Sequence, residues 1–193
     1  MNHSIQIDEK KLDQLIDQDK IIDQDKIIDQ DKIIDQDKMM LNPMIKIIDE
    51  IKNLKFRPSW DEYFITISYL ISKRSSCNRL NVGCVIVKDK RIVTTGYNGF
   101  IAGAPHVGII RDNHEQMTIH AETNAIADAS KRGVSLNEST AYITHFPCIN
   151  CCKILIASGI KTIIYGESYK NDELVHSLCE KGNVKLSKYN YIS

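Results

Sequence analysis

The stretch Thr118–Glu122 reads Thr-Ile-His-Ala-Glu, and Phe146–Cys151 reads Phe-Pro-Cys-Ile-Asn-Cys. Together they give the pattern H-x-E followed by P-C-x-x-C. The imidazole of His120 and the thiolates of Cys148 and Cys151 form a ligand set that suits Zn²⁺. Three protein ligands leave one position open for water, which is typical of a catalytic rather than a structural zinc site. The sequence therefore predicts one catalytic zinc ion.

The spacing of these residues predicts that two helices begin at the metal. Cys148 and Cys151 are three residues apart and so share one face of a helix, and Pro147 before them is typical of a helix start. His120 and Glu122 are two residues apart and would point to nearly opposite sides of a regular helix. They can converge only if His120 lies at the helix entrance. Glu122 is then left as an acid–base group beside the water, not as a ligand.

The rest of the domain alternates helices and strands around this site. Ser59 and Glu62 form a capping box that starts a helix running to about Arg74. Hydrophobic period, β-branching and glycines predict strands at 82–87, 91–97, 140–144, 161–165 and 184–187, and helices at 120–131, 148–158 and 171–180. The first two strands form a hairpin, and strands joined by helices should be mostly parallel. This order predicts an α/β fold of three α-β-α layers, with a mixed sheet of about five strands and helices on both faces.

The N-terminal segment has low complexity. Leu15–Lys38 reads as four hexads, of which the last three are Ile-Ile-Asp-Gln-Asp-Lys. A six-residue period rotates the Ile pair by about 240° per repeat, so no continuous apolar stripe forms on a helix. We predict that residues 1–42 are a tail without a catalytic role, either disordered or a frayed helix, with a self-association arm as the alternative. Residues 43–55 are predicted to be a linker helix and 56–193 the catalytic domain.

The composition limits the class of protein. The chain has 193 residues, with 25 basic and 25 acidic side chains, so its formal net charge is zero. Binding to nucleic acid is therefore not expected, since non-specific binders usually carry a basic surplus. No apolar run is long enough to span a membrane. Two of the six cysteines fall in the metal pattern and no signal peptide is recognised, so a reducing, cytoplasmic location is expected.

Six segments of the chain carry a resemblance to one family. They are Arg57–Phe64, Val82–Val87, Gly96–Gly99 (Gly-Tyr-Asn-Gly), His120–Ile126, Thr144–Cys148 and Ser158–Lys161. With the H-x-E and P-C-x-x-C signature of zinc nucleobase deaminases, they resemble the deoxycytidylate (dCMP) deaminases of the cytidine deaminase superfamily. The resemblance covers about Arg57 to Lys188. It implies a cytidine-deaminase-like fold and the zinc-dependent hydrolysis of dCMP to dUMP, which supplies thymidylate synthesis.

The same resemblance implies roles for particular residues. Zinc would lower the pKa of its water, and Glu122 would move protons from that water to N3 of cytosine and to the departing amine. Asn98 would hydrogen-bond the nucleoside, although Asn-Gly is also a common turn, and the Ala121 backbone N–H would orient the base. Tyr169 is the leading candidate for the 5′-phosphate. The other candidates for that role are Lys73, Arg74, Arg79 and Lys170.

Residues 98–118 are long and irregular in pattern, which favours a functional loop. Members of the family are often hexamers that dCTP activates and dTTP inhibits, so the resemblance implies a homo-oligomer, a hexamer, with these nucleotides as possible effectors at the loop. Many relatives bind a second, structural zinc through cysteines of this loop. Here the loop has no cysteine, and His106 and His114 alone make a poor zinc site. The sequence therefore argues against a second zinc.

Other functions fit parts of the pattern. Zinc deaminases also act on dCTP, on cytidine, or on a base in tRNA or single-stranded DNA, and polynucleotide editors would be expected to carry a basic, aromatic channel. A C-x-x-C pair alone is compatible with a redox pair or half of a structural zinc site. A non-catalytic zinc-stabilised assembly module is the most distant alternative. In such a module Glu122 would be dispensable, because no proton transfer takes place.

Overall fold

The structure, a computed structural model, describes residues 42–111 and 114–191, apart from the side chain of His114. The chain divides into two compact units, one ending at Arg57 and the other beginning at Pro58. We describe each unit by itself. Within the described ranges, no helix is long and apolar enough to cross a membrane.

The described part of the first unit is one helix, α3 (Pro43–Lys52). Its first turn is capped by Asn42, whose side chain accepts a hydrogen bond from the Met44 backbone N–H at 3.1 Å, and Pro at the first helical position suits a helix start. The helix covers the first ten residues of the segment 43–55 that was predicted to be a linker helix. The tail predicted for residues 1–42 lies outside the described residues, except for Asn42.

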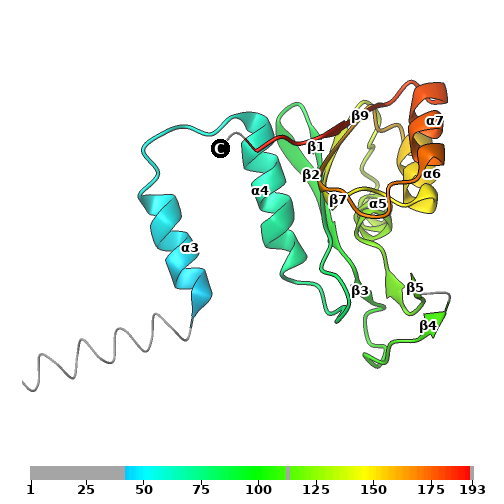
Figure 1. The fold of residues 1–193 in the computed structure, drawn as a ribbon, viewed down its shortest axis with the longest axis horizontal. Coiled ribbons are helices and arrows are strands. Elements are labelled where there is room, and N and C mark those ends of the chain that lie inside the picture. Colours follow the sequence, from blue (N-terminus) through cyan, green and yellow to red (C-terminus); the bar gives the residue numbers. More distant parts are fainter. Residues whose placement is uncertain (1–41, 112–113, 192–193) are drawn as a thin grey trace, which may run out of the picture. The chain divides into compact units, whose positions relative to one another are not determined.

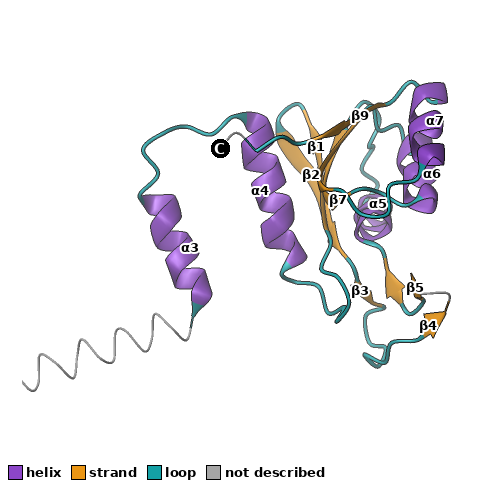
Figure 2. Ribbon diagram, viewed as in Figure 1, coloured by secondary structure: helices purple, strands orange, loops and turns teal. Residues whose placement is uncertain are grey.

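The second unit is built on a mixed five-stranded sheet (Figures 1 and 2). Its strand order is β2-β1-β7-β8-β9, where β1 is antiparallel to both β2 and β7, and β8 is parallel to both β7 and β9. The strands are β1 (Gly83–Lys88), β2 (Arg91–Tyr97), β7 (Thr140–His145), β8 (Thr162–Glu167) and β9 (Lys185–Lys188). The predicted hairpin and the predicted parallel pairs are confirmed.

Helices cover both faces of this sheet, so the predicted three-layer α/β fold is confirmed (Figure 1). One face carries α4 (Trp60–Ser72), and the other carries α5 (Ala121–Lys131), α6 (Ile149–Ala157) and α7 (Glu173–Lys181). The capping box at the start of α4 is present, with the Ser59 and Glu62 side chains each bonded to the other's backbone N–H. Predicted and observed helices and strands of this unit agree within two residues at each end.

Two apolar cores hold the layers together. The smaller core lies between α4 and the sheet and is built from Phe64, Ile65, Val85, Val87 and Tyr142. The larger core lies on the other face, where alanines of α5 and leucine and cysteine side chains of α6 and α7 meet the strands. Burial of these side chains is the main stabilising term for the arrangement. The packing of the larger core places the N-terminal ends of α5 and α6 close to each other.

The segment 98–118 differs from the irregular loop that its sequence predicts. It contains four two-residue strands: β3 (Gly99–Phe100), β4 (Ile110–Arg111), β5 (His114–Glu115) and β6 (Thr118–Ile119). β3 pairs with β6 and β4 pairs with β5, both antiparallel. Strands this short show no alternating pattern, so periodicity could not find them. The β3–β6 pair returns the chain to the start of α5, next to the end of β2.

Candidate active site

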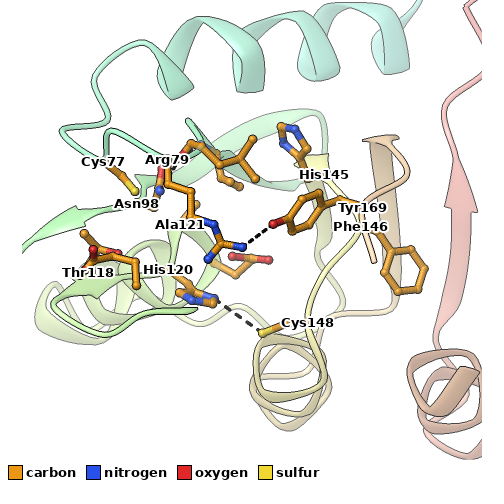
Figure 3. A pocket seen from close by; sticks show the side chains of 14 residues that line it. Cys77, Arg79, Asn98, Thr118, His120, Ala121, His145, Phe146, Cys148 and Tyr169 are labelled. Carbon is orange, nitrogen blue, oxygen red and sulfur yellow. Dashed lines mark hydrogen bonds between the residues drawn. The ribbon is translucent and has the colours of Figure 1, made fainter. Parts of the chain in front are cut away.

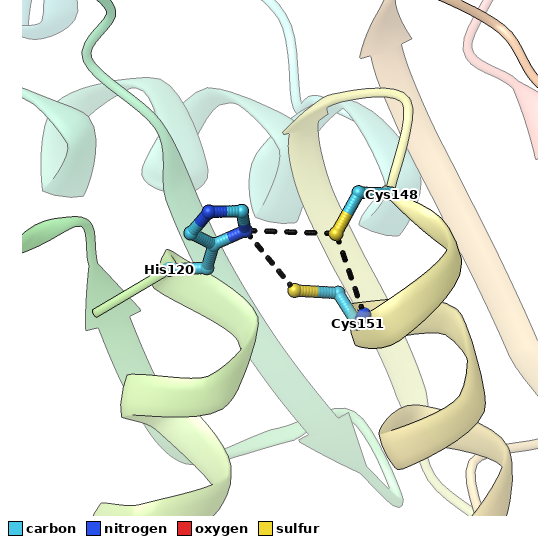
Figure 4. A group of neighbouring side chains, drawn as sticks. All are labelled: His120, Cys148 and Cys151. Carbon is cyan, nitrogen blue, oxygen red and sulfur yellow. Dashed lines mark hydrogen bonds between the residues drawn. The ribbon is translucent and has the colours of Figure 1, made fainter. Parts of the chain in front are cut away.

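The structure brings the three predicted zinc ligands together (Figure 4). His120 is the N-cap of α5, Cys148 is the N-cap of α6, and Cys151 lies in the first turn of α6. His120 Nδ1 lies 3.6 Å from Cys148 Sγ and 3.4 Å from Cys151 Sγ. The placement of His120 at the helix entrance agrees with the expectation drawn from its spacing to Glu122.

These separations fit a single zinc ion. Zinc bonds of about 2.0–2.1 Å to nitrogen and 2.3 Å to sulfur, at a tetrahedral angle, place the two ligand atoms about 3.6 Å apart. The three ligand atoms of His120, Cys148 and Cys151 all lie within 4.8 Å of one another. Both the donor set and its spacing therefore suit zinc. Among the residues that the structure describes, no other group of three or more His, Cys, Asp or Glu side chains has such an arrangement.

Local hydrogen bonds favour the thiolate form of Cys148, whereas the hydrogen bond with Cys148 and burial raise the pKa of Cys151. The pKa of Cys148 is lowered to about 3, first by its hydrogen bond with the Cys151 thiol and then by that with His120. The Cys151 backbone N–H also donates to Cys148 Sγ at 3.5 Å, and Thr123 Oγ1 lies 3.8 Å from Cys151 Sγ. Two helix N-termini, each with a positive dipole end, meet here and favour thiolate.

Glu122 stands beside this cluster as a buried carboxyl group. It is the second residue of α5, its exposed fraction is 4%, and it lines the same pocket as His120 and Cys148. Burial raises the pKa of Glu122, and the nearby Cys148 thiolate raises it further. A carboxyl group whose pKa moves toward neutrality can both accept and return a proton at neutral pH. Glu122 lies outside the three-residue ligand group, which is compatible with the acid–base role predicted for it.

A pocket of about 110 Å³ opens in front of these residues (Figure 3). It is lined by His120, Glu122, Cys148, Asn98, Ala121 and Tyr169 of the predicted site residues, whereas the third predicted ligand, Cys151, is buried and does not line it. Ala121 also lines it, and Leu80 and Val82 supply apolar atoms, whereas the ring of Phe146 points away from the pocket and packs against Tyr165 and His176 in the core (Figure 3). Apolar walls with a few polar groups suit a flat aromatic ring that must be oriented by hydrogen bonds.

Asn98 shapes this pocket through its own hydrogen bonds. Its Oδ1 accepts from the Val82 backbone N–H at 2.8 Å and from Ser75 Oγ at 2.7 Å. Its Nδ2 donates to the Leu80 carbonyl oxygen at 2.7 Å. Asn98 therefore links the segment after α4 to the end of β2. The sequence had suggested only a turn or a contact with the nucleoside for this residue, not this structural role. Nδ2 carries a second hydrogen, which is available to a ligand.

Arg79, His145 and Tyr169 also line the pocket. Arg79 Nη2 donates a hydrogen bond to Tyr169 Oη at 2.5 Å, and the rings of Tyr169 and His145 meet edge to face at 6.2 Å. A neighbouring hollow of about 360 Å³ shares Arg79 and His145 with this pocket and adds Lys73. Arg74 and Lys170 are not among the residues that line either cavity.

His145 and Glu115 also line the pocket, although sequence reasoning assigned them no role. His145 ends β7, where its Nδ1 lies 2.9 Å from Thr144 Oγ1, and burial lowers the pKa of its imidazole. Its position at the carboxyl end of a parallel strand was a usable signal, because ligands of α/β sheets bind there. Glu115 offered no such signal, since its place depends on the pairing of β3 with β6 and β4 with β5.

The comparisons with known proteins agree with this geometry. Residues 58–167 match the family model described as the cytidine and deoxycytidylate deaminase zinc-binding region. ComE operon protein 2 of Bacillus subtilis is 46% identical over 136 residues, which cover 68% of this chain and 72% of that protein. The deoxycytidylate deaminase of Saccharomyces cerevisiae is 32% identical over 164 residues, which cover 78% of this chain and 52% of that enzyme. The crystal structure of dCMP deaminase from the cyanophage S-TIM5 with dCMP and dUMP superimposes with a TM-score of 0.63 and 27% identity, covering 69% of this chain and 99% of that one.

Proposed function

Because the chain belongs to the cytidine and deoxycytidylate deaminase family, whose members are zinc-dependent hydrolases, we propose that it converts dCMP to dUMP and thereby supplies thymidylate synthesis. The observation that carries the proposal is the zinc-spaced trio of His120, Cys148 and Cys151 beside the buried carboxyl of Glu122. Support for the substrate comes from relatives called deoxycytidylate deaminase and from the cyanophage enzyme solved with dCMP and dUMP.

The proposed reaction is an addition of water followed by loss of ammonia. Zinc held by His120 Nδ1 and by the sulfurs of Cys148 and Cys151 would supply the Lewis acidity that makes water a nucleophile near neutral pH. Glu122 accepts a proton from the attacking water as its oxygen bonds to C4 of cytosine. The same carboxyl group delivers this proton to N3. It then takes the second proton from the hydroxyl group on C4 and passes it to the amine, so that the C4=O bond forms, the C4–N bond breaks and ammonia leaves.

The base would be oriented by the first turn of α5 and by Asn98. Ala121 is the first residue of that helix, and a backbone N–H at this position has no acceptor within the helix. It can therefore donate to the carbonyl oxygen of cytosine. The second hydrogen of Asn98 Nδ2 faces the nucleoside in this arrangement. The apolar side chains of Leu80 and Val82 would pack against the ring.

We place the 5′-phosphate at the Arg79–Tyr169 pair, because a guanidinium and a phenol in one hydrogen bond offer several donors to an anion. Arg79→Ala should then lower kcat/KM for dCMP by about 10- to 100-fold, the effect of losing one hydrogen bond to a charged group. The kcat/KM for deoxycytidine, which lacks the phosphate, should stay within a factor of about two. Arg91→Ala, at an exposed arginine at the start of β2, is the matched control. Equal losses for both substrates would contradict this placement.

The direct test of the function is ammonia release by zinc-loaded protein. The substrates are dCMP, dCTP, cytidine and deoxycytidine, each assayed alone and with dCTP or dTTP as a possible effector. We expect turnover of dCMP at least about 100-fold above that of the unphosphorylated nucleosides, the discrimination available from charged hydrogen bonds. Zinc-loaded protein that releases no ammonia from any of the four would rule out the proposal. Activation by dCTP with inhibition by dTTP would show that the loop 98–118 retains regulation.

We also propose that the protein is cytoplasmic, since thiolate ligands persist in a reducing compartment. From the family resemblance we propose that it is a homo-oligomer, a hexamer. The apolar side chains of α3 and the following turn are all exposed; they are Met44, Ile45, Ile47, Ile48, Ile51, Leu54 and Phe56. The opposite side of α3 carries the charged residues Lys46, Asp49, Glu50 and Lys52, so the helix is amphipathic. Pairing of α3 with α3 of a second copy would bury the apolar side of the helix.

Introducing lysine on the apolar side of α3 tests that pairing. Ile48→Lys should lower the molar mass measured by sedimentation equilibrium, because a charge in an apolar interface is costly to bury. Asn53→Lys introduces the same side chain on the polar side of the helix and should leave the mass unchanged. Equal masses for Ile48→Lys and the wild type would show that α3 does not contribute to assembly.

A further inference from the structure

The pocket contains a carboxylate that the proposed reaction does not use. Glu115, at the end of β5, lines the pocket together with Thr118 and Asn98. A second acid is unexpected in a site for a nucleotide, because a carboxylate repels a phosphate and weakens binding unless it accepts a hydrogen bond from the ligand. Glu115 in the pocket wall therefore indicates that the bound molecule donates a hydrogen bond to its carboxylate.

The Glu115 side chain is held in place by the loop around it. Its Oε1 accepts hydrogen bonds from the backbone N–H groups of Ile109 at 3.1 Å and Met117 at 2.8 Å. A Cβ atom at Gly108 would lie 2.5 Å from Glu115 Oε2, so a glycine at this position leaves room for the carboxylate. Because Oε1 serves the backbone, Oε2 is the oxygen that can accept a hydrogen from a ligand. A carboxylate fixed in this way is preorganised for binding.

The chemistry of a deoxycytidine nucleotide offers few donors to such a group. Apart from the phosphate, dCMP has two donors, the 4-amino group of the base and the 3′-hydroxyl of the sugar. The amine must lie near Glu122 for the reaction to occur. Arg79 and Tyr169 take the phosphate on one side of the pocket, and Thr118 lies on the opposite side in Figure 3. The 3′-hydroxyl is therefore the donor left for Glu115.

We infer that Glu115 Oε2 accepts a hydrogen bond from the 3′-hydroxyl of the bound deoxyribonucleotide and makes Glu115 a specificity-determining residue for that hydroxyl. The inference rests on the proposed function, because it takes the base and phosphate positions from it. The negative charge of Glu115 has a second consequence. It disfavours the reversed orientation of the nucleotide, in which the phosphate would lie against Glu115 instead of Arg79.

The test pairs a change in the residue with a change in the substrate. Wild type and Glu115→Gln are each assayed with dCMP and with 2′,3′-dideoxycytidine monophosphate, which lacks the 3′-hydroxyl. Wild type should prefer dCMP by about 10- to 150-fold in kcat/KM, the effect of one hydrogen bond to a charged group. Glu115→Gln keeps an oxygen for the two backbone N–H groups but loses the charged acceptor, so the preference should fall to about threefold or less.

Two outcomes would overturn the inference. One is a wild-type preference near unity, and the other is a Glu115→Gln variant whose rates fall equally for both nucleotides, which is what a purely structural role in the loop predicts. Glu138→Gln, an exposed glutamate paired with Lys161 at 3.7 Å, makes the same chemical change elsewhere and should retain the wild-type preference. If Glu115→Gln fails to fold, Glu115→Asp keeps the charge on a shorter side chain, and its preference should lie below that of wild type.

The same comparison can be made by binding alone, which separates this inference from the proposed function. Isothermal titration of the zinc-loaded protein with dCMP and with the dideoxynucleotide gives a ratio of dissociation constants that needs no turnover. A protein that releases no ammonia from dCMP but binds it about tenfold or more tightly than the dideoxynucleotide, with the difference lost in Glu115→Gln, would refute the reaction and retain the role of Glu115. Equal dissociation constants in wild type would refute the role of Glu115 whether or not dCMP is deaminated.

Discussion

Glu122→Gln should retain the zinc and the fold while lowering kcat for dCMP by about 10²- to 10⁴-fold, the usual contribution of a positioned proton-transfer group. The reason lies in the environment of Glu122. The side chain is buried beside the ligand cluster, and its burial raises the pKa of the carboxyl so that it can accept and return protons near neutrality. Glutamine has the same shape and can keep the packing, but it cannot carry the proton from water to the base.

The measurement is ammonia release under saturating dCMP, together with zinc content by atomic absorption and thermal unfolding. His120→Ala is the contrasting variant, because it removes a ligand and should lose both zinc and turnover. Wild-type kcat in Glu122→Gln would mean that the carboxyl serves packing alone. That result would keep the deaminase activity but remove Glu122 from the proposed proton transfer.

Gly96→Ala should markedly lower the free energy of unfolding of the protein. A Cβ atom at Gly96 would lie 2.2 Å from the Ala121 carbonyl oxygen and 2.5 Å from the Ala125 backbone nitrogen. Both are backbone atoms of α5, so the helix as a whole must move away from β2. Overpacking of this kind costs about 3 kcal/mol or more. The moving helix also carries His120 and Glu122, so zinc affinity and turnover should fall together with stability.

Urea unfolding of the zinc-loaded protein measures the loss of stability, and zinc titration measures the loss of affinity. Gly133→Ala is the matched control, because Gly133 has a φ of +67° and a Cβ atom there would meet nothing within 4 Å. That variant should cost only about 1 kcal/mol of backbone strain and leave the zinc affinity unchanged. If Gly96→Ala were as stable as Gly133→Ala, the close approach of α5 to β2 would not be a constraint on this protein.

Much of the site was predictable because its signals are local. The i to i+3 spacing of Cys148 and Cys151 and the i to i+2 spacing of His120 and Glu122 limit where each helix can begin. The structure places His120 and Cys148 at the two N-caps, as these spacings require. Strand and helix periodicity likewise located the sheet and its covering helices, since each pattern is contained within one element.

The walls of the pocket were not predictable in the same way. Arg79 and Tyr169 are 90 positions apart in the sequence and meet only because the segment after α4 and the end of β8 lie at one edge of the sheet. Asn98 was expected to contact substrate, yet most of its hydrogen-bonding capacity is used to join Val82, Leu80 and Ser75. No periodic pattern records contacts of this range.

The sequence by itself determined which residues we propose as metal ligands and as acid–base group, the order of the main helices and strands, and the resemblance to a deaminase family. Each of these depends on residue chemistry and on spacings of a few positions, which local backbone geometry converts directly into structure. Only the tertiary structure decided which side chains line the pocket, including Glu115, which reaches it because β3 pairs with β6 and β4 with β5. Those pairings are two residues long, so they carry no strand pattern of their own that the sequence would reveal.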